Sequence, residues 1–311
     1  MAAYGPHLPS EEDAPERLPC RESGQLTGHE GAVLAVRFNR QGTYILSCGK
    51  DQTVRLWNPH RQLLIKTYTG HGYEVRDTAV LRDNSQFATV GGDREIFLWD
   101  VGSGRIIRRF RGHEKMANAV EFGPDDATLV TAGYDQCVKV WDCRARTYDA
   151  LQTMKAFKDS VTCLQVTSAP DIIAGSVDGT VRRFDIRAGR MYTDDLHNPV
   201  TGIAVSGDEQ CILASCMADR ILLIDKSSGQ LLETYRGHKH RAYKVECCFT
   251  PSDAAIVGAS EDGQVLYWDL VDAKVIRRFT AHDGVICSIA MHPEGTSLVT
   301  SSTGGDIKVW T

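Results

Sequence analysis

Three stretches of the chain each carry a His, a Ser or Thr, an Asp and a Trp in the same order and at the same spacing. A hydroxyl, an imidazole and a carboxylate are the groups of a nucleophilic catalytic triad, so the first hypothesis for this pattern is a catalytic site. A triad is a single constellation, whereas this set recurs at a fixed period, which indicates a structural role in a repeated unit. The three sets are His29, Ser47, Asp51 and Trp57; His71, Thr89, Asp93 and Trp99; and His113, Thr131, Asp135 and Trp141.

The period of the repeat is about 42 residues, and a Trp-Asp pair or a related pair ends each unit. The first residues of these pairs are separated by 42, 42, 43, 40, 44 and 42 positions: Trp57, Trp99, Trp141, Phe184, Ile224, Trp268 and Trp310. Within each unit, short β-branched and aromatic runs alternate with turn residues, which predicts four strands and almost no helix. The fold class predicted from seven such units is all-β, a seven-bladed β-propeller.

The two ends of the chain predict how the ring closes. The seventh unit stops at Trp310-Thr311, after its third strand, while the stretch from Gly24 to His29 resembles the fourth strands of other units. We therefore expect the N-terminal strand to complete the last blade, which leaves no open sheet edge. Residues 1–20 are proline-rich with an acidic trio and are predicted to be a disordered tail, and residues 21–311 are predicted to form a single propeller.

Over residues 24–311 the sequence resembles the WD-repeat family. The resemblance implies that in each blade the His contacts the Asp and the hydroxyl, which in turn meets the Trp indole N–H; buried polar tips need such partners. Blade six has His238, Asp262 and Trp268, with Gly258 in the hydroxyl position. Three other blades also depart from the full set. Blade seven has His282, Thr300 and Trp310, with Gly304 where the Asp is expected. Blade four keeps Asp178, with Phe157 and Phe184 in the His and Trp positions, and blade five has Ala218 and Ile224 in the Asp and Trp positions.

Composition argues against several classes of function. The formal net charge is −5, which does not favour a nucleic-acid-binding domain. The ten cysteines include no CxxC pair, and the histidines lack the spacing of zinc ligands, so we expect no metal and no cofactor. No apolar run is long enough to span a membrane, and no signal peptide is recognised at the start. Unpaired cysteines without a secretion signal predict a cytoplasmic and nuclear location.

With the repeated residues assigned to structure, function is expected on the loops. By resemblance, the narrow face of a WD propeller, built from the segment after each Gly-His pair and the residue before each turn Asp, is the family's commonest docking surface. Tyr and Arg anchor many protein interfaces, and Tyr73 and Glu74 lie together on this rim. The docking candidates are Lys50, Tyr73, Glu74, Met116, Tyr134, Arg241, Glu261 and Asp283; Glu30, Ser160 and Val177 occupy equivalent positions.

Several local runs go beyond the general repeat. They lie at 57–68, 67–80, 141–146, 174–194, 243–248 and 260–275. In these runs the chain resembles the mitogen-activated protein kinase organizers, small WD-repeat scaffolds. The resemblance implies a non-catalytic role in a kinase cascade and association with the spliceosome in mRNA splicing. It also implies protein partners, with a monomeric propeller working inside larger complexes.

Three alternatives remain open at this point. Cullin-type ubiquitin ligase receptors carry a WDxR motif, which here would place Arg144 and Arg187 against the ligase adaptor. A propeller enzyme would need convergent catalytic groups, and the sequence shows none outside the repeated set. Direct RNA binding would use basic fragments such as Arg108-Arg109, Arg182-Arg183 and Arg277-Arg278, although the net charge is negative and arginines beside a strand are more often solvated.

Overall fold

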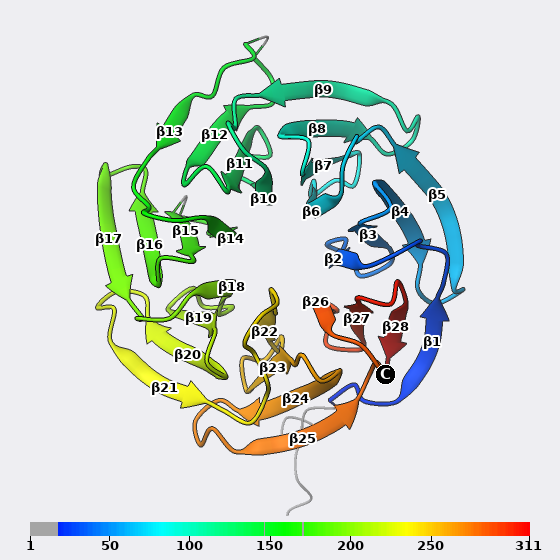
Figure 1. Cartoon of the computed structure of the whole chain (residues 1–311), viewed down its shortest axis with the longest axis vertical. Helices are drawn as coiled ribbons and strands as arrows, with labels where there is room; N and C mark the ends of the chain where they lie inside the picture. Colours follow the sequence, from blue (N-terminus) through cyan, green and yellow to red (C-terminus); the bar gives the residue numbers. More distant parts are fainter. Residues whose placement is uncertain (1–17, 146, 170) are drawn as a thin grey trace, which may run out of the picture.

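The computed structural model describes residues 18–145, 147–169 and 171–311, and these residues form 28 β-strands and no helix. The strands make seven antiparallel sheets of four strands each. Figure 1 shows the sheets arranged around one axis as the blades of a propeller, with β2, β6 and β10 close to the axis and β5 and β9 at the circumference. The sequence-based prediction of an all-β, seven-bladed propeller is therefore confirmed.

Blades one to six each follow the chain from an inner first strand to an outer fourth strand. Blades one to three comprise β2 (Val33–Phe38), β3 (Ile45–Gly49), β4 (Thr53–Asn58) and β5 (Leu63–Thr69); β6 (Val75–Val80), β7 (Gln86–Gly91), β8 (Glu95–Asp100) and β9 (Ile106–Arg111); and β10 (Ala117–Phe122), β11 (Thr128–Gly133), β12 (Val138–Asp142) and β13 (Gln152–Met154). Blades four to six comprise β14 (Val161–Val166), β15 (Asp171–Ser176), β16 (Thr180–Asp185) and β17 (Arg190–Asp195); β18 (Val200–Val205), β19 (Cys211–Cys216), β20 (Arg220–Asp225) and β21 (Leu231–Tyr235); and β22 (Cys247–Phe249), β23 (Ala255–Ala259), β24 (Gln264–Asp269) and β25 (Val275–Thr280).

Blade seven joins the two ends of the chain. Its strands are β26 (Ile286–Met291), β27 (Leu298–Ser302), β28 (Ile307–Trp310) and β1 (Glu22–Leu26), and β1 takes the outer position. The antiparallel register pairs Glu22 with Trp310 and Leu26 with Ile307. Beyond the strand, the backbone N–H of Arg21 donates to the carbonyl of Thr311 over 3.1 Å. The predicted closure by the N-terminal strand is confirmed.

Residues 18–20 pack against the propeller, although the sequence assigned them to a tail. Leu18 packs against the cluster of buried side chains between blades six and seven, and Pro19 is buried. The hydroxyl of Tyr267 donates to the carbonyl of Pro19 over 2.7 Å. Residues 18–20, which composition assigned to a tail because of their prolines and polar neighbours, are therefore part of the propeller. The rest of the predicted tail, residues 1–17, lies outside the described residues.

The position of a strand within its blade decides how much of it is buried. The second strands β3 and β27 are buried along their whole length, because neighbouring blades cover both of their faces. The outer strands β17 and β25 are mostly exposed. This gradient explains why the second strands are apolar runs, while the outer strands contain charged and polar residues as well.

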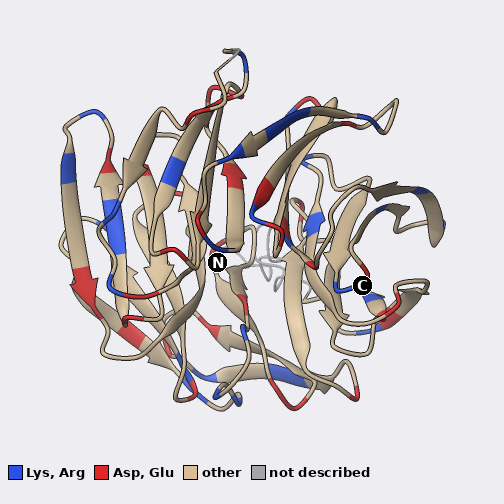
Figure 2. Cartoon of the chain, turned by 45° about the horizontal axis from the view of Figure 1, so that its top comes forward, with Lys and Arg blue, Asp and Glu red and all other residues tan. Residues whose placement is uncertain are grey.

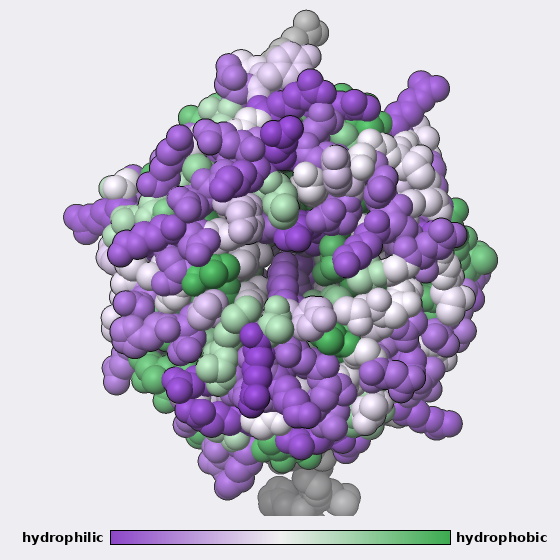
Figure 3. All heavy atoms as spheres, in the orientation of Figure 1, coloured by the Kyte–Doolittle hydropathy of each residue, from purple (hydrophilic) through white to green (hydrophobic). Residues whose placement is uncertain are grey.

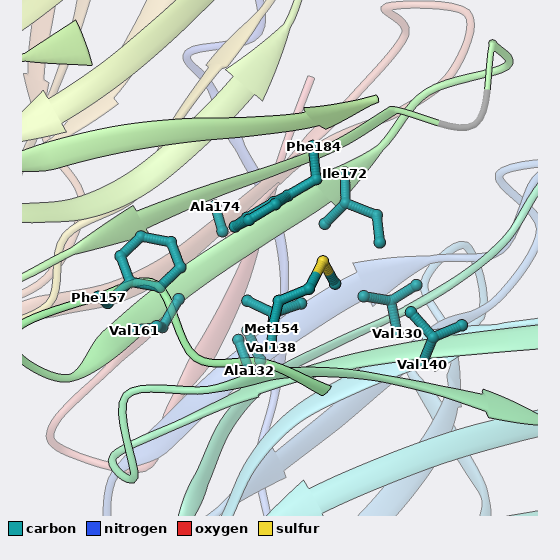
Figure 4. Close-up of a cluster of buried hydrophobic side chains, with 11 residues drawn as sticks. Val130, Ala132, Val138, Val140, Met154, Phe157, Val161, Ile172, Ala174 and Phe184 are labelled. Atoms are coloured by element: carbon teal, nitrogen blue, oxygen red, sulfur yellow. The ribbon is translucent and has the colours of Figure 1, made fainter. Parts of the chain in front are cut away.

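Apolar side chains fill the space between adjacent blades. Between blades three and four, Figure 4 shows Met154 among side chains from both sheets, including Val138 and Ile172. Phe157 and Phe184 from blade four complete this cluster, with ring centroids 6.1 Å apart. Each blade thus buries its faces against its two neighbours, and the stability of each interface depends on both blades being in place.

Polar side chains on the inner strands also connect neighbouring blades. Arg76 donates to the side-chain oxygen of Asn118 over 2.8 Å, and the Asn118 amide donates to the hydroxyl of Ser160 over 2.9 Å. These two bonds join blades two, three and four. The hydroxyl of Thr162 donates to the carbonyl of Val200 over 2.6 Å and joins blade four to blade five. These bonds therefore connect blades two to five around the axis.

Closure by β1 can be tested with one substitution. Leu26 is 1% exposed and packs in the cluster between blades seven and one, so Leu26→Ala is expected to lower the free energy of unfolding by about 2–5 kcal/mol. Gln25→Ala, at an exposed position of the same strand, is the matched control and should change it by less than about 0.5 kcal/mol. Urea denaturation measures the free energy of unfolding of both variants. If the two substitutions lowered it equally, β1 would not complete the blade.

Candidate functional site

The repeated His, hydroxyl, Asp and Trp form a closed chain of hydrogen bonds in blade one. Trp57 Nε1 donates to Ser47 Oγ over 2.7 Å, Ser47 lies 2.7 Å from His29 Nε2, and His29 Nδ1 lies 2.8 Å from Asp51 Oδ2. All donors are satisfied when the Ser hydroxyl donates to Nε2 and the ring donates through Nδ1. Burial works to raise the pKa of Asp51, but the hydrogen bond and the charge of His29 outweigh it and hold the pKa at about 2.

Blades two and three repeat this geometry. In each, the Thr hydroxyl lies between the Trp indole and the imidazole: Trp99–Thr89 2.8 Å, Thr89–His71 2.7 Å and His71–Asp93 2.7 Å; Trp141–Thr131 2.9 Å, Thr131–His113 2.8 Å and His113–Asp135 2.9 Å. Ser47, Thr89 and Thr131 are all 0% exposed, so no substrate can reach the hydroxyls. The structure therefore places these residues as cross-links within a blade, as the sequence repeat indicated.

The prediction that blade seven lacks its Asp is wrong. Asp306 supplies the carboxylate, with Oδ2 2.7 Å from His282 Nδ1. Thr300 bonds His282 Nε2 over 2.7 Å and accepts from Trp310 Nε1 over 2.9 Å. The turn holds Gly304 and Gly305, and Gly305 adopts a φ of +91°, so the backbone bends enough to bring in a carboxylate from two positions further along the chain. A fixed spacing could not reveal this shift.

The prediction of a partial His-Asp-Trp set in blade six is also wrong. Both ring nitrogens of His238 are buried without a hydrogen-bond partner, and Asp262 instead pairs with Lys239 at 3.4 Å. Trp268 Nε1 donates to the carbonyl of Arg236 over 2.9 Å. A Cβ on Gly258 would lie 2.8 Å from the Trp268 ring, so this indole fills the space that a hydroxyl side chain would need. Burial, followed by the neighbouring His240, lowers the pKa of His238 to about 4.

His240 takes a place between blades five and six that the sequence did not assign. It is 0% exposed, and its Nε2 lies 3.0 Å from the hydroxyl of Thr201 in blade five. Its backbone N–H donates to Asp219 Oδ1 over 2.7 Å, which makes Asp219, rather than Ala218, the acidic residue of that turn. The sequence contained a signal for this role of His240. Its separations from Gly258 and Asp262 equal those of His29 from Ser47 and Asp51 in blade one, whereas the separations of His238 do not.

Blade four replaces the polar set with aromatic packing. The ring of Phe157 packs on Phe184, and the Arg182 guanidinium lies 4.8 Å from the centroid of Phe157. Asp178 keeps its turn role, accepting from the backbone N–H of Lys158 over 2.9 Å. Blade four therefore keeps the turn and exchanges the buried hydrogen bonds for apolar contact at the positions where the sequence has Phe157 and Phe184.

The loops before the inner strands and the turns between the second and third strands meet at one end of the ring, which we call the narrow face. Among the docking candidates on this face, Lys50, Tyr73, Tyr134, Arg241 and Asp283 are exposed. Glu30 is exposed as well, and Met116 is half-buried. The exposed fractions of Tyr73 and Tyr134 are 62% and 47%, which leaves two aromatic rings available to a partner.

Neighbouring charges hold parts of this face in place. Glu74 is half-buried and lies 3.5 Å from the Arg76 guanidinium, so part of its charge is already neutralised. The Lys115 ammonium lies 5.3 Å from the centroid of the Tyr134 ring. Such a cation–π contact restricts an exposed aromatic side chain before a partner binds.

Blade six contributes a structured loop to the narrow face. One carboxylate oxygen of Glu261 accepts from the backbone N–H groups of Arg241, Ala242 and Tyr243 over 2.6–2.9 Å. Glu261 is therefore a residue that shapes the loop, and its prediction as a docking group does not match this geometry. The loop presents Tyr243, which is 49% exposed, beside Arg241. Tyr243 was missed by the sequence because the loop is extended relative to other blades.

Two further positions are less accessible than the sequence suggested. Ser160 is 3% exposed and accepts from the Asn118 amide. Val177 is half-buried, with its backbone N–H donating to the carbonyl of Ser160 over 2.9 Å. Ser160 therefore belongs to the contact between blades three and four, and Val177 to a backbone bond within blade four.

The arginines of the WDxR-like motifs lie at the other end of the ring, which we call the opposite face. Arg144 and Arg187 are exposed and belong to the turns between the third and fourth strands of blades three and four. The backbone N–H of Arg144 donates to Asp142 Oδ1 over 2.7 Å, so the Asp of the motif closes the turn. The two sets of candidates therefore occupy different faces, and substitutions can separate them.

The arginines of the third and outer strands are engaged by their own blade or by the next one. Arg111 forms an ion pair with Glu95 at 2.5 Å, and Arg108 donates to the carbonyl of Asp142 over 2.9 Å. Arg183 likewise donates to the carbonyl of Lys226. Figure 2 shows basic and acidic residues interspersed around the ring, without a continuous basic face in that view.

The described residues contain no group of three His, Cys, Asp or Glu side chains arranged to hold a metal ion. The same ranges, 18–145, 147–169 and 171–311, contain no helix that is long and apolar enough to cross a membrane. All ten cysteines are free thiols, and burial raises the pKa of several of them, including Cys143, Cys163 and Cys287, each to about 11. Thiols with such raised pKa values are poor nucleophiles at neutral pH.

Comparison with known families settles what the repeat is. The model of the WD domain, G-beta repeat, matches residues 20–58, 62–100, 104–142, 149–185, 229–269 and 273–311. The chain belongs to this WD40-repeat family. Most of blade five lies in the unmatched stretch, where Ala218 and Ile224 replace the signature residues. WD40 propellers are generally non-catalytic scaffolds for protein–protein interactions.

Relatives of similar length extend the match to the whole chain. The chain is 53% identical to WD repeat domain-containing protein 83 of Rattus norvegicus over 297 residues, which covers 96% of this chain and 93% of the relative. It is 48% identical to the protein of the same name in Homo sapiens, over 97% of this chain and 96% of the relative. The homolog in Dictyostelium discoideum is 28% identical over 92% of this chain and 96% of the relative.

The blade cross-link gives a stability prediction. Thr89→Val keeps the shape of the side chain but leaves His71 Nε2 and Trp99 Nε1 without their shared partner. Because unpaired buried polar groups keep their full desolvation cost, the free energy of unfolding should fall by about 2–4 kcal/mol. Thr89→Ser retains the hydroxyl and is expected to lower the free energy of unfolding clearly less in the same urea titration. A Val variant as stable as the Ser variant would contradict the cross-link.

His238 gives a prediction about pH. Its folded pKa of about 4 lies below the ordinary value of 6.5, so its contribution to stability is present above pH 6.5 and is lost as the pH falls towards 4. In His238→Phe, the fall in unfolding free energy between pH 7 and pH 5 should shrink by about 2 kcal/mol. His197→Phe, whose ring is exposed, is the control and should follow the unsubstituted protein. Identical pH profiles for all three proteins would refute the assignment.

Proposed function

We propose that the chain is a non-catalytic scaffold that brings partner proteins together on its narrow face. The observation that carries the proposal is the set of exposed tyrosines on this face: Tyr73, Tyr134 and Tyr243 are 62%, 47% and 49% exposed. Tyr and Arg dominate the energetics of many protein interfaces. The cross-links beneath the loops of Tyr73 and Tyr134, and the bonds from Glu261 to the loop of Tyr243, fix the backbone, so little conformational entropy is lost when a partner binds.

The partners that we propose are proteins of a mitogen-activated protein kinase cascade and of the spliceosome. This part of the proposal rests on the resemblance of the chain to the kinase organizers, and relatives of similar length are consistent with it. Ten free cysteines favour a reducing compartment, so we propose the cytoplasm and the nucleus as the sites of action. The blocked hydroxyls of the repeated sets support a role without catalysis.

The second candidate is a receptor for a cullin-type ubiquitin ligase. The specific observation in its favour is that Arg144 and Arg187 are exposed at neighbouring turns of the opposite face. On this alternative the arginines would contact the ligase adaptor, and the narrow face would remain free for a substrate. The two candidates therefore predict sensitivity to substitutions on opposite ends of the ring.

Affinity purification with mass spectrometry separates these functions. A narrow-face variant combines Tyr73→Ala, Tyr134→Ala and Tyr243→Ala, and an opposite-face variant combines Arg144→Ala with Arg187→Ala. Anchor residues of this kind contribute about 2 kcal/mol or more each to binding. The narrow-face variant should therefore bind kinase-cascade and spliceosomal proteins at least about 30-fold more weakly and no longer recover them. The second variant should retain them.

Two outcomes would overturn the proposal. Partner recovery that is unchanged in the narrow-face variant would show that this face is not the docking surface. Recovery of a cullin adaptor that is lost in the opposite-face variant would favour the ligase function instead. Thermal unfolding of both variants, expected to match the unsubstituted protein because all five side chains are exposed, separates lost binding from lost folding.

A further inference from the structure

A pocket between blades one and two differs in character from the channel along the axis. Figure 3 shows the channel as a hollow at the centre of the ring, with hydrophilic residues inside. The pocket has a volume of about 260 Å³, and turns of the opposite face form its mouth. Tyr44 and Ile65 are exposed, so the pocket opens to solvent. Six of its eight lining residues carry apolar or aromatic side chains: Tyr44, Leu46, Leu56, Ile65, Val80 and Val101.

A small residue at the end of an inner strand leaves this space. The inner strands β2 and β10 end on Phe38 and Phe122, whereas β6 ends on Val80. Phe122 packs against the buried cluster between blades two and three. At the corresponding place between blades one and two, the shorter Val80 side chain leaves room for a ligand.

Hydrogen bonds from both blades fix the wall of the pocket. The backbone N–H of Val101 donates to the carbonyl of Ser85 over 2.9 Å, and the Val101 carbonyl accepts from the hydroxyl of Tyr68 over 3.1 Å. The Lys66 ammonium donates to the carbonyl of Gly102 over 2.6 Å. The pocket is therefore preformed, which lowers the entropy cost of filling it.

One polar atom beside the pocket has no partner. Asn84 lines the pocket, and its Oδ1 is buried and accepts no hydrogen bond from the described residues. The neighbouring amides fix which atom this is. Asn39 Oδ1 accepts from the N–H of Tyr44, so Asn39 Nδ2 is the atom that donates to Gln41 Oε1. Gln41 Oε1 then accepts from Asn84 Nδ2 over 2.6 Å, which leaves Asn84 Oδ1 as the acceptor without a donor.

This acceptor selects among apolar ligands. An unpaired buried acceptor keeps its desolvation cost until a donor reaches it, so a ligand that carries an N–H or O–H is favoured over one that carries none. Among the described residues, the Asn84 carboxamide has no hydrogen bond other than the one to Gln41, so a small rotation turns Oδ1 towards a donor in the pocket.

We propose that the pocket receives a tryptophan side chain of a partner protein, whose indole N–H donates to Asn84 Oδ1. An apolar cavity of about 150 Å³ accepts benzene, so about 260 Å³ admits two fused rings. An indole carries its N–H on an edge, whereas a phenol would carry its hydroxyl into the inner end, which Leu46 and Leu56 make apolar. This inference rests on the proposed scaffold function, because it adds a contact on the face that the tyrosines do not use.

The test uses the full-length chain and four blocked pentapeptides, in which glycines flank tryptophan, tyrosine, leucine or benzothienylalanine. Benzothienylalanine has the shape of tryptophan, with a sulfur in place of the indole N–H. NMR titrations follow the methyl groups of Ile65, Val80 and Val101, which line the pocket. The tryptophan peptide should shift these resonances and bind at least about fivefold more tightly than each of the other three peptides.

Three variants sharpen the test. Val80→Phe introduces the residue that ends β2 and β10, and it should fill the pocket and abolish the shifts at Ile65 and Val101. Val205→Phe, the same change at the end of β18 and outside the pocket, should retain them. Asn84→Gly suits the φ of +60° at this position and should remove the preference for tryptophan over benzothienylalanine. Thermal unfolding checks that each variant is folded.

Three results would overturn the proposal: equal binding of the tryptophan and benzothienylalanine peptides, binding of the tyrosine or leucine peptide as tight as that of the tryptophan peptide, or no methyl shift with the tryptophan peptide. The peptides replace the natural partner, and the narrow-face tyrosines do not line the pocket. A failure here is therefore distinguishable from a failure to recover partners through the narrow face.

Discussion

The hydrogen bonds between β1 and β28 join the two ends of the chain, and the closed ring depends on them. Each blade buries both faces against its neighbours, so an open ring would expose two apolar sheet faces and the edge of β28. Residues as far apart in sequence as Ser23 and Val309 then become neighbours, since the Ser23 hydroxyl donates to the Val309 carbonyl over 3.1 Å. Closure therefore turns seven similar sheets, each marginal alone, into one cooperative unit.

In the closed ring, most of the repeated polar side chains are buried and bonded to one another, where no substrate can reach them. The His, Asp, hydroxyl and Trp sets satisfy one another inside the blades, and they fix the loops above them. Departures from the set fall in blades four, five and six, where His238 has no partner and His240 bridges two blades. Local rules tend to be broken where a surface is specialised. The loop that carries Tyr243 lies at this departure, which is consistent with a docking surface.

The fold was predictable from the sequence because its period, its strand patterns and its closing strand are all local features of the chain. The site was less predictable, because side chains exchange roles across space. Asp306 replaces the expected carboxylate through a glycine-rich bend, and the Trp268 indole occupies the space left by Gly258. Neither change alters the period. Ser160 and Glu261 appeared to be surface groups by position, yet contacts with Asn118 and with a folded loop engage them.

Native-state hydrogen exchange on β1 and β28 tests the closed ring most directly. If β1 closes the ring, the hydrogen-bonded amides of Glu22–Leu26 should exchange as slowly as those of Ile307–Trp310, through the same global opening, because β1 pairs with β28 as the outer strand of the same sheet. Exchange of the β1 amides that is faster by several orders of magnitude, while β28 remains protected, would contradict it. In that case blade seven would be stable with three strands, and the N-terminal strand would not be what holds the ring together.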